Sequence, residues 1–370
     1  MKFHKFTFSI TALLLSASLN LSYAGDADIN SLKLIGSYEI ETGTQAFNTE
    51  FGGISGLDMA EDGLFWAISD ERGGEKGTPR FYKIKLEYDE NGIQNFAVDS
   101  VHNMQTPQGE NFSSDSRTVD PEAIRHTSNG TLYWSSEGNW NDDSTKRYQP
   151  FIREMKEDGS YFREFKIPEQ FLYKDNKTSG VRNNNSFEGL AVTPNGSMFF
   201  ATEVALYQDG EAASVDNGSK IRITKFDPSA NTTLAQYVYE LPKIPTPSPK
   251  QGYVDNGLTE LLAISDNEFL TLERSFADDV GNTIRIVKIT ITDETTDVKD
   301  MDSLKEAKYT PVERKVVLEL TPEFEGIKMD NMEAMSWGKT LTNGHKTLVI
   351  ASDNNFNKKQ RTLFMVFEVN

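Results

Sequence analysis

The amino-acid sequence predicts an all-β fold, a β-propeller made of four-stranded blades. Short runs rich in β-branched and aromatic residues alternate with Gly and Asn, and no long segment has the 3.6-residue apolar periodicity of a helix. Five segments of the chain also align with one another at steps of 66 to 73 residues. Four-stranded units that repeat around an axis form a propeller, so the repeat count predicts five blades. A sixth blade would need strands that the sequence does not display.

Each repeat opens on a segment whose second residue serves as a marker, and a tight turn follows. The five segments are Ile54-Ser55-Gly56-Leu57, Pro121-Glu122-Ala123-Ile124, Phe187-Glu188-Gly189-Leu190, Thr259-Glu260-Leu261-Leu262 and Met332-Glu333-Ala334-Met335, and the turns are Asp62-Gly63, Asn129-Gly130, Asn195-Gly196, Asp266-Asn267 and Asn343-Gly344. Asn-Gly and Asp-Gly are strong hairpin signals, because both residues tolerate positive φ angles. A β-sandwich with coincidental repeats, the alternative fold, does not account for this shared order.

The second strand of each repeat ends on an acidic residue, and outer strands follow. The acids are Asp70, Glu137, Glu203, Glu273 and Asp353. Third strands are predicted within 80–84, 150–153, 221–224, 284–287 and 363–366, and fourth strands within 96–104, 161–167, 234–241 and 315–320. The fifth repeat has no fourth strand of its own, and residues 32–38 form a strand that could supply it. Such a pairing would close the ring and protect both sheet edges.

The marker and the acid of each repeat should lie at the same end of the propeller. In a blade the first strand lines the central channel, and the second runs antiparallel to it. The start of the first strand and the end of the second therefore meet at one mouth of the channel. The long connections also fall at this end, among them 105–120, 168–186 and 242–258. Long loops on a rigid scaffold are where sites are usually built.

Four of the five markers are glutamates that would face one another across the channel mouth. They are Glu122, Glu188, Glu260 and Glu333, and Ser55 is the fifth marker. Crowded carboxylates cannot all ionise without a cation or shared protons. A divalent metal ion bound by oxygen ligands alone would relieve the repulsion, and Ca²⁺ is the preferred candidate. The alternative is that each Glu caps backbone N–H groups between blades, and the two roles can coexist.

The acids that end the second strands extend this candidate metal site. We expect Asp70, Glu137, Glu203, Glu273 and Asp353 to be further ligands or to lie just behind them, with Asp120, Asn256 and Asn331 nearby. One carboxylate of the ring formed by Glu122, Glu188, Glu260 and Glu333 would then serve as the general base.

Two arginines and two asparagines are candidate substrate-binding residues at the same end. Arg72 and Arg274 follow second-strand acids, and the planar guanidinium accepts bidentate phosphate or carboxylate oxygens. Inter-blade ion pairs are an equally good interpretation of both arginines. Asn354 and Asn355 place oxygen-bearing side chains beside Asp353.

Composition excludes several other classes of function. The formal net charge is −18, and a chain this acidic is a poor nucleic-acid binder. There is no Cys for disulfides, thiol catalysis or thiolate metal sites. No Gly-x-Ser-x-Gly elbow is present, and the few His residues are poorly placed for a catalytic triad. A hydrolase of this composition would therefore depend on a metal-activated water.

The first 24 residues have the pattern of a secretory signal peptide. Lys2 and Lys5 precede an apolar run from Phe6 to Leu15, and small residues follow up to Ala24. The run is too short to span a membrane. Cleavage near Ala24 would leave 36 basic and 56 acidic residues, a net charge of −20, in one domain at 25–370. We expect a periplasmic or secreted protein.

The chain resembles the bacterial phytase-like family, also called "esterase-like activity of phytase". The matching segments are 52–57, 68–70 with 80–82, 120–124, 136–138, 185–191, 272–276, 330–335 and 352–356 with Gln360 and Thr362. The resemblance covers roughly 50–370 and implies an exported propeller linked by name to phosphoester or carboxylester hydrolysis. Ala123 and Ala334 stand where the family pattern has Gly after Glu, which leaves the carboxylates in place. The chain differs from the calcium-dependent β-propeller phytases.

These observations predict an exported hydrolase of a small-molecule ester or phosphoester, with a divalent metal at the channel mouth. The alternatives are a non-catalytic propeller that binds a ligand or a protein, and a Ca²⁺-dependent lactonase on a similar scaffold. No feature of the sequence indicates a particular protein partner.

Overall fold

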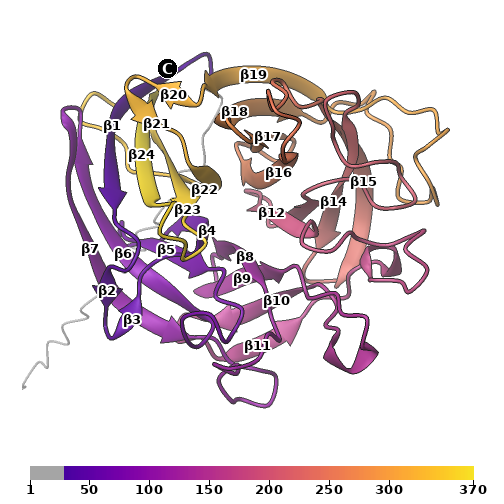
Figure 1. Cartoon of the computed structure of the whole chain (residues 1–370), viewed down its shortest axis with the longest axis horizontal. Coiled ribbons are helices and arrows are strands. Elements are labelled where there is room, and N and C mark those ends of the chain that lie inside the picture. The colour runs from indigo at the N-terminus through magenta and orange to yellow at the C-terminus, as the bar shows by residue number, and fades with distance from the viewer. Residues whose placement is uncertain (1–28) are drawn as a thin grey trace, which may run out of the picture.

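The computed structural model describes residues 29–370, which form a five-bladed β-propeller (Figure 1). Five four-stranded antiparallel sheets surround a central axis, and their inner strands contact one another in the order β4, β8, β12, β16, β22 and back to β4. The predicted fold class and the five blades are confirmed. The predicted signal peptide at 1–24 lies outside the described residues.

The strands follow one another outward from the axis in each blade. Blade 1 consists of β4 (Ile54–Met59), β5 (Phe65–Ser69), β6 (Arg80–Asp89) and β7 (Gly92–Asn103), and blade 2 of β8 (Pro121–His126), β9 (Thr131–Ser136), β10 (Phe151–Lys156) and β11 (Tyr161–Glu164). Blade 3 consists of β12 (Phe187–Val192), β13 (Met198–Thr202), β14 (Ser219–Asp227) and β15 (Thr232–Leu241), and blade 4 of β16 (Val254–Ala263), β17 (Glu268–Ala277), β18 (Gly281–Thr290) and β19 (Glu313–Leu320). Blade 5 consists of β22 (Asn331–Trp337), β23 (Thr347–Asp353), β24 (Thr362–Val369) and β1 (Leu32–Ile40).

The connections contain two small hairpins and two single turns of 3₁₀-helix. The hairpins are β2 (Gln45–Ala46) with β3 (Thr49–Glu50) and β20 (Glu323–Phe324) with β21 (Ile327–Lys328), and the 3₁₀ turns are η1 (Ser144–Lys146) and η2 (Glu169–Phe171). No helix within residues 29–370 has the length and apolarity to cross a membrane.

The ring is closed by the first strand, as the sequence predicts. β1 is the outermost strand of blade 5 and pairs antiparallel with β24, from Leu32 opposite Val369 to Ile40 opposite Thr362. The edge that β24 would otherwise expose is thereby hydrogen-bonded, which removes a template for aggregation.

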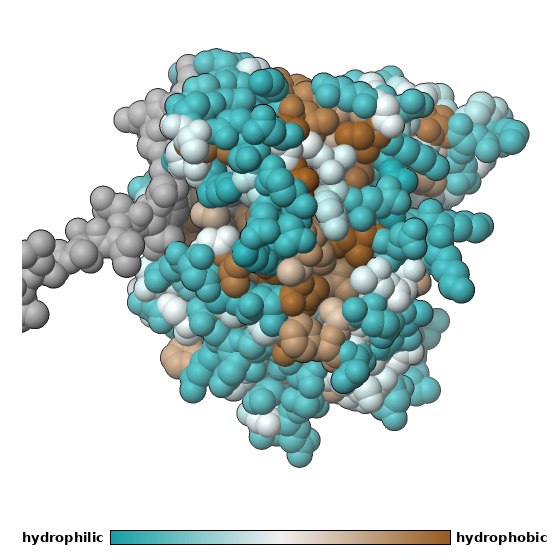
Figure 2. Space-filling view, turned by 90° about the vertical axis from the view of Figure 1, so that its left-hand side faces the viewer, coloured by the Kyte–Doolittle hydropathy of each residue, from teal (hydrophilic) through white to brown (hydrophobic). Residues whose placement is uncertain are grey.

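The hydrophobic core lies between neighbouring blades. Every residue of β5, β13 and β23 is buried, because both faces of each sheet pack against adjacent sheets. Between blades 1 and 2, for example, Trp66 and Ile68 pack with Ile124 and Trp134. Part of the outer surface is seen in Figure 2, where hydrophilic residues predominate around smaller hydrophobic areas, in keeping with the net charge of −18.

The predicted hairpin turns lie at the end of the propeller opposite the markers. Gly63, Gly130, Gly196 and Gly344 have φ angles of +81°, +71°, +82° and +90°. Glycine adopts this left-handed region without the steric cost that a Cβ would add. The strand directions therefore bring the markers and the second-strand acids to the other end.

A β-bulge in each inner strand decides which side chain reaches the channel mouth. The register shifts at Ser55, Glu188 and Glu333 in blades 1, 3 and 5, and across Glu122 and Ala123 in blade 2. A bulge leaves one residue unpaired and re-aims its side chain. In these four blades the bulged residue is the marker.

Blade 4 differs, and the sequence alignment of this repeat is wrong by one residue. Leu258 pairs with Glu273 and Glu260 pairs with Leu272, so the bulged residue is Thr259. The residue that follows Glu273, Arg274, then occupies the position of the second-strand acids. Thr259 and Arg274 are 15 residues apart, the same spacing as Glu188 and Glu203 in blade 3. Glu260 and Glu273 are thus displaced from the positions that the sequence assigned to them.

A buried ion pair between Arg125 and Glu260 lies among the inner strands of the blades. The Arg125 guanidinium lies 2.7 Å from Glu260 and donates to the carbonyl oxygens of Leu57, Leu261 and Met335, on the inner strands of three other blades. Blade 3 joins through the backbone N–H of Leu190, which donates to Glu260. Burial raises the pKa of Glu260, and the Arg125 charge at 2.7 Å is the main opposing influence, which favours the ionised pair. All five blades therefore meet at one ion pair.

We expect Arg125→Met to lower the free energy of unfolding by about 3–5 kcal/mol, because it leaves Glu260 buried without its partner. Urea denaturation measures the loss. The double variant Arg125→Met/Glu260→Gln should recover part of it, since the uncompensated carboxylate is gone. As a control, Lys85→Met removes a surface pair with Glu87 and should cost less than about 1 kcal/mol. An Arg125→Met protein as stable as the Lys85→Met protein would contradict a central role for the pair.

Candidate functional site

A pocket of about 790 Å³ opens at the marker end of the channel. It is lined by the bulged residues of blades 2, 3 and 5, by second-strand ends and by long loops. The lining residues include Asp70, Arg72, Glu122, Asn184, Glu188, Glu203, Tyr253, Asp255, Arg274, Asn331, Glu333, Asp353 and Asn355. The pocket thus lies where the sequence places the candidate site.

Seven of the nine predicted metal ligands lie at this mouth, and all seven are buried. They are Asp70, Glu122, Glu137, Glu188, Glu203, Glu333 and Asp353. Asp120, which the sequence suggested as an additional ligand, lies beside Glu122 and Glu137. Carboxylates from four of the five blades therefore converge at one mouth.

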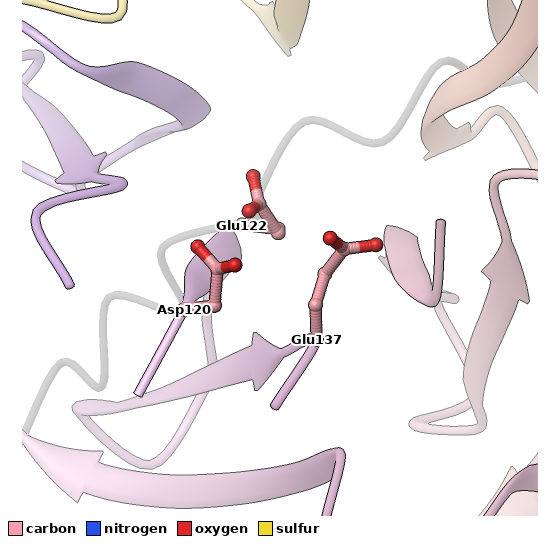
Figure 3. Close-up of side chains that lie close together, drawn as sticks. All are labelled: Asp120, Glu122 and Glu137. Carbon is pink, nitrogen blue, oxygen red and sulfur yellow. The ribbon is translucent and has the colours of Figure 1, made fainter. Parts of the chain in front are cut away.

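Five of these carboxylates form two tight sets. Oxygen atoms of Asp120, Glu122 and Glu137 lie within 4.8 Å of one another, and so do oxygen atoms of Glu137, Glu188 and Glu203. Figure 3 shows the first set, whose carboxyl groups face one another from β8, β9 and the residues beside them. Oxygen atoms at this spacing can bind one Ca²⁺, because its bonds to oxygen are about 2.3–2.6 Å long.

Burial and mutual repulsion make these carboxylates hard to ionise. Burial raises the pKa of Asp70 to about 8, that of Glu203 to about 7 and that of Asp120 to about 6, against the opposing charges of Arg72 and Arg274. For Glu122, Glu137, Glu188 and Asp353, burial together with neighbouring carboxylates raises the pKa well above its usual range, and burial also raises that of Glu333. A cation at the mouth would favour the ionised forms.

Three buried carboxylate oxygens of the five lack a hydrogen-bond partner within the described residues, namely Oδ1 of Asp120, Oε2 of Glu137 and Oε2 of Glu188. Oδ1 of Asp120 lies 2.8 Å from the Arg72 guanidinium, which leaves the oxygens of Glu137 and Glu188 without a cationic neighbour of this kind. The other oxygen of Glu137 accepts the backbone N–H of Ser186. Buried polar atoms are nearly always hydrogen-bonded, so these two oxygens are suited to a ligand.

Arg274 is bound by carboxylates on several sides. Its guanidinium lies 2.7 Å from Glu203 and 3.3 Å from Asp255, and it also contacts Glu333. The Asn331 side chain accepts a further hydrogen bond of 2.7 Å from it. Arg274 thus joins blades 3, 4 and 5, which is the ion-pair role that the sequence left open, while it still lines the pocket.

Arg72 is held in a similar way on the opposite side of the pocket. Its guanidinium lies 2.8 Å from Asp120 and 3.8 Å from Asp70, and it donates to Asn184 at 2.9 Å. The adjacent Glu71 is fully buried and accepts backbone N–H groups from its own loop, including that of Lys76. This carboxylate fixes the loop that presents Arg72 to the mouth.

Asn354 and Asn355 have different environments. Asn354 is fully buried, where its side chain accepts from the backbone N–H groups of Gly53 and Phe356 and donates to Thr42. The structure therefore gives Asn354 a role in fixing the loop. Asn355 lines the pocket and remains accessible to a ligand.

The structure does not bring Glu260 and Glu273 to the pocket. Glu260 pairs with Arg125 among the inner strands, and Glu273 contacts Tyr239 and, at 2.6 Å, Arg314 between blades. The one-residue offset of blade 4 is the reason, because it turns both side chains away from the mouth. Asn256, named with the nearby oxygen ligands, is buried and donates to the carbonyl of Pro242.

Sequence reasoning missed several residues of the pocket. Asp255 pairs with Arg274, Asn185 donates to Glu203, and the exposed side chain of Tyr253 lines the pocket. The Asn183-Asn184-Asn185 run in a long mouth loop is a signal that could have pointed to this wall. Asp255 lies before the misaligned marker of blade 4, so its position was hidden by the same offset.

Comparisons with known proteins give one family and several distant folds. A family model described as "Phytase-like: Esterase-like activity of phytase" matches residues 49–356. No curated protein sequence matches the chain. Among solved structures, the RS223 β-xylosidase is 10% identical, with 90% of this chain and 95% of that chain covered and a TM-score of 0.44. The PQQ-bound aldose sugar dehydrogenase of Streptomyces coelicolor is 9% identical, with 90% and 98% covered and a TM-score of 0.35. Likenesses this weak carry no argument about activity.

We expect the metal-free protein to lose stability as the pH rises from about 4.5 to about 8. The raised pKa values mean that the folded state keeps protons that the unfolded chain has released, so unfolding becomes easier as pH rises. The loss should exceed about 1.4 kcal/mol, the effect of one pKa unit on one group. Urea denaturation in EDTA at pH 5 and pH 8 measures it.

The Asp70→Asn protein should show a smaller loss, because one of the titrating groups is removed. His102 acts in the opposite direction, since burial lowers its pKa, and His102→Gln should therefore steepen the loss. A metal-free protein that is equally stable at both pH values would contradict this electrostatic description of the mouth.

Proposed function

Because the chain belongs to the phytase-like family, we propose that it is an ester hydrolase whose substrate, a phosphoester or a carboxylester, binds at the channel mouth. We propose further that its cofactor is a divalent cation, and Ca²⁺ is the preferred candidate. The signal-peptide pattern of residues 1–24 supports a periplasmic or secreted location.

The observation that carries this proposal is the excess of buried carboxylates over cationic groups at the mouth. Ten carboxylates surround the pocket, namely Asp70, Asp120, Glu122, Glu137, Glu188, Glu203, Asp255, Asp330, Glu333 and Asp353. Two guanidinium groups, Arg72 and Arg274, lie among them, and two exposed lysines, Lys328 and Lys359, also line the pocket. Isolated buried charges are costly, so such a ring is stable when protons or a cation neutralise it. An all-oxygen set suits Ca²⁺.

The residues present fit such a cation. Glu137 and Glu188 each direct an unpartnered buried oxygen to the mouth, and Asp120, Glu122 and Glu203 lie within ligand spacing of Glu137. When bound, the cation would polarise the ester oxygen and acidify a water molecule.

The side chains of this chain would bind the substrate and move its protons. A carboxylate of the ring that is not tied to an arginine can accept a proton from water, and Glu122 and Glu188 meet this condition. Arg72 and Arg274 line the pocket while their carboxylate partners hold them in place, so they offer preorganised donors to an anionic group of the substrate. Asn355 can donate from the rim.

A serine nucleophile is a poorer explanation of hydrolysis by this protein. Ser100 and His102 form a hydrogen bond of 2.9 Å, but both lie on β7, the outermost strand of blade 1. The buried hydroxyl of Ser55, the marker of blade 1, has no hydrogen-bond partner within the described residues, but neither Ser55 nor any histidine is among the residues that line the pocket.

The proposal is tested with Glu188→Gln against a panel of phosphomonoesters and p-nitrophenyl carboxylesters. We expect wild type to hydrolyse one of the two substrate classes, EDTA to abolish this activity and Ca²⁺ to restore it. The variant should lose at least a hundredfold in kcat/KM, because general-base catalysis typically contributes about 10²–10⁴. Glu211→Gln, at a 78%-exposed side chain on the same face, is the matched control and should be as active as wild type.

The panel also separates the proposal from its rival, a binding propeller. The feature that favours this rival is that Arg72 and Arg274 already form ion pairs with carboxylates of the protein, which gives both a structural role. Absence of turnover on every ester, with Ca²⁺ present, would support binding alone. Turnover that survives in Glu188→Gln and in EDTA would remove both this carboxylate and the cation from the reaction.

A further inference from the structure

The acidic mouth contains two cation-sized sets of ligands. Asp120, Glu122 and Glu137 form one set and Glu137, Glu188 and Glu203 form the other, with Glu137 the member they share. The first set belongs to blade 2, where Asp120 precedes β8, Glu122 lies on β8 and Glu137 follows β9 (Figure 3). The second set crosses the seam between blades 2 and 3, because Glu188 lies on β12 and Glu203 follows β13. A single carboxylate thus stands between two groups of acids.

The backbone fixes Glu137 at this seam. Its own N–H donates to the carbonyl of Asp120 at 3.0 Å, and one oxygen of its carboxylate accepts the N–H of Ser186 from blade 3. The carbonyl of Ser186 in turn accepts the N–H of Glu203 at 2.8 Å. The first residue of one set and the last residue of the other are therefore tied to Glu137 through main-chain hydrogen bonds, so the two sets are held in register.

The charges of the two sets are unequally compensated. Asp120 pairs with Arg72 at 2.8 Å and Glu203 pairs with Arg274 at 2.7 Å. Within residues 29–370, no basic side chain forms an ion pair with Glu122, Glu137 or Glu188. Each set thus has one basic partner, which is bound to Asp120 in the first set and to Glu203 in the second. The three remaining carboxylates lie between these two arginines and have no basic partner of their own. An oxygen of Glu137 and an oxygen of Glu188 are buried and also lack a hydrogen-bond donor.

We propose that the mouth holds two divalent cations bridged by the carboxylate of Glu137, one in each set. This inference rests on the proposed cation at the mouth and adds its number and its ligands. One cation spans about 5 Å between opposite ligand oxygens, which is the size of one set. A single ion in either set would leave two buried carboxylates of the other set without it, and one of these has no basic partner. Carboxylate-bridged cations lie about 3.5–4 Å apart in two-metal sites.

The experiment counts the cations and tests whether they are neighbours. Metal-free full-length protein is titrated with Mn²⁺, a divalent ion that also takes oxygen ligands. The bound metal is measured by equilibrium dialysis with elemental analysis, and its electron paramagnetic resonance spectrum is recorded. We expect two Mn²⁺ per chain and the exchange-coupled spectrum of a close pair. Ca²⁺ should displace both ions.

Variants assign the two sets. Asp120→Asn should retain one ion with an uncoupled spectrum, held by the second set, and Glu188→Gln should retain one ion held by the first. Glu137→Gln should abolish the coupled spectrum and weaken both ions at least tenfold. Glu211→Gln is the control and should bind two coupled ions. Circular dichroism shows whether Glu137→Gln folds. If it does not, Asp120→Asn and Glu188→Gln still decide the question, because each should retain one ion.

The outcomes distinguish this inference from the proposed function. One ion per wild-type chain would overturn the bridged pair and leave a hydrolase with a single cation. Two ions without coupling would overturn the bridge through Glu137. No bound ion would overturn both this inference and the proposed cofactor, whereas two coupled ions in a protein without ester turnover would uphold the pair and overturn the hydrolase.

Discussion

The ion pair of Arg125 and Glu260 is the interaction on which the rest of this propeller depends. The five inner strands carry backbone N–H and C=O groups close to one axis, where they need hydrogen-bond partners other than bulk water. One guanidinium, with five donors in a fixed plane, reaches carbonyl groups of several blades at once, and Glu260 both neutralises it and accepts N–H groups from blades 3 and 4. The pair is buried among the inner strands, and neither of its residues lines the acidic pocket. The carboxylates of the pocket are poorly solvated because they are themselves buried.

Much of this architecture could be predicted from the sequence, because hairpin turns and repeated strands are local signals. The Asp-Gly and Asn-Gly turns located the hairpins, and the missing strand of the last blade identified β1 as its partner. The end of the propeller that carries the site followed from strand direction alone. Blade 4 shows the limit of this reasoning. Both Thr259 and Glu260 are plausible markers by composition, and the choice between them depends on where the bulge falls, which is decided by pairing between strands rather than by either residue.

The pairing of charges at the mouth was beyond prediction for a different physical reason. Arg274 and Glu203 lie far apart in the sequence and meet because adjacent blades are rotated about a common axis. Which carboxylate an arginine selects depends on distances of a few ångströms, and no repeat alignment resolves these. The acids at repeated positions were nevertheless found in seven of nine cases. The result is an asymmetric ring: one blade contributes a guanidinium where the others contribute a carboxylate, and the uncompensated acids gather around Glu137.

The pairing of β1 with β24 has a consequence for how the chain acquires its structure. This sheet joins residues more than three hundred positions apart, so the last blade is completed only after the whole domain has emerged. Until then, β1 lacks the strand with which it pairs, and the ring is open. Contacts between residues so far apart in the sequence form slowly, because the entropy of closing a long loop is lost before they stabilise the fold. Because the ring closes last, the acidic mouth is complete only when β24 has paired with β1.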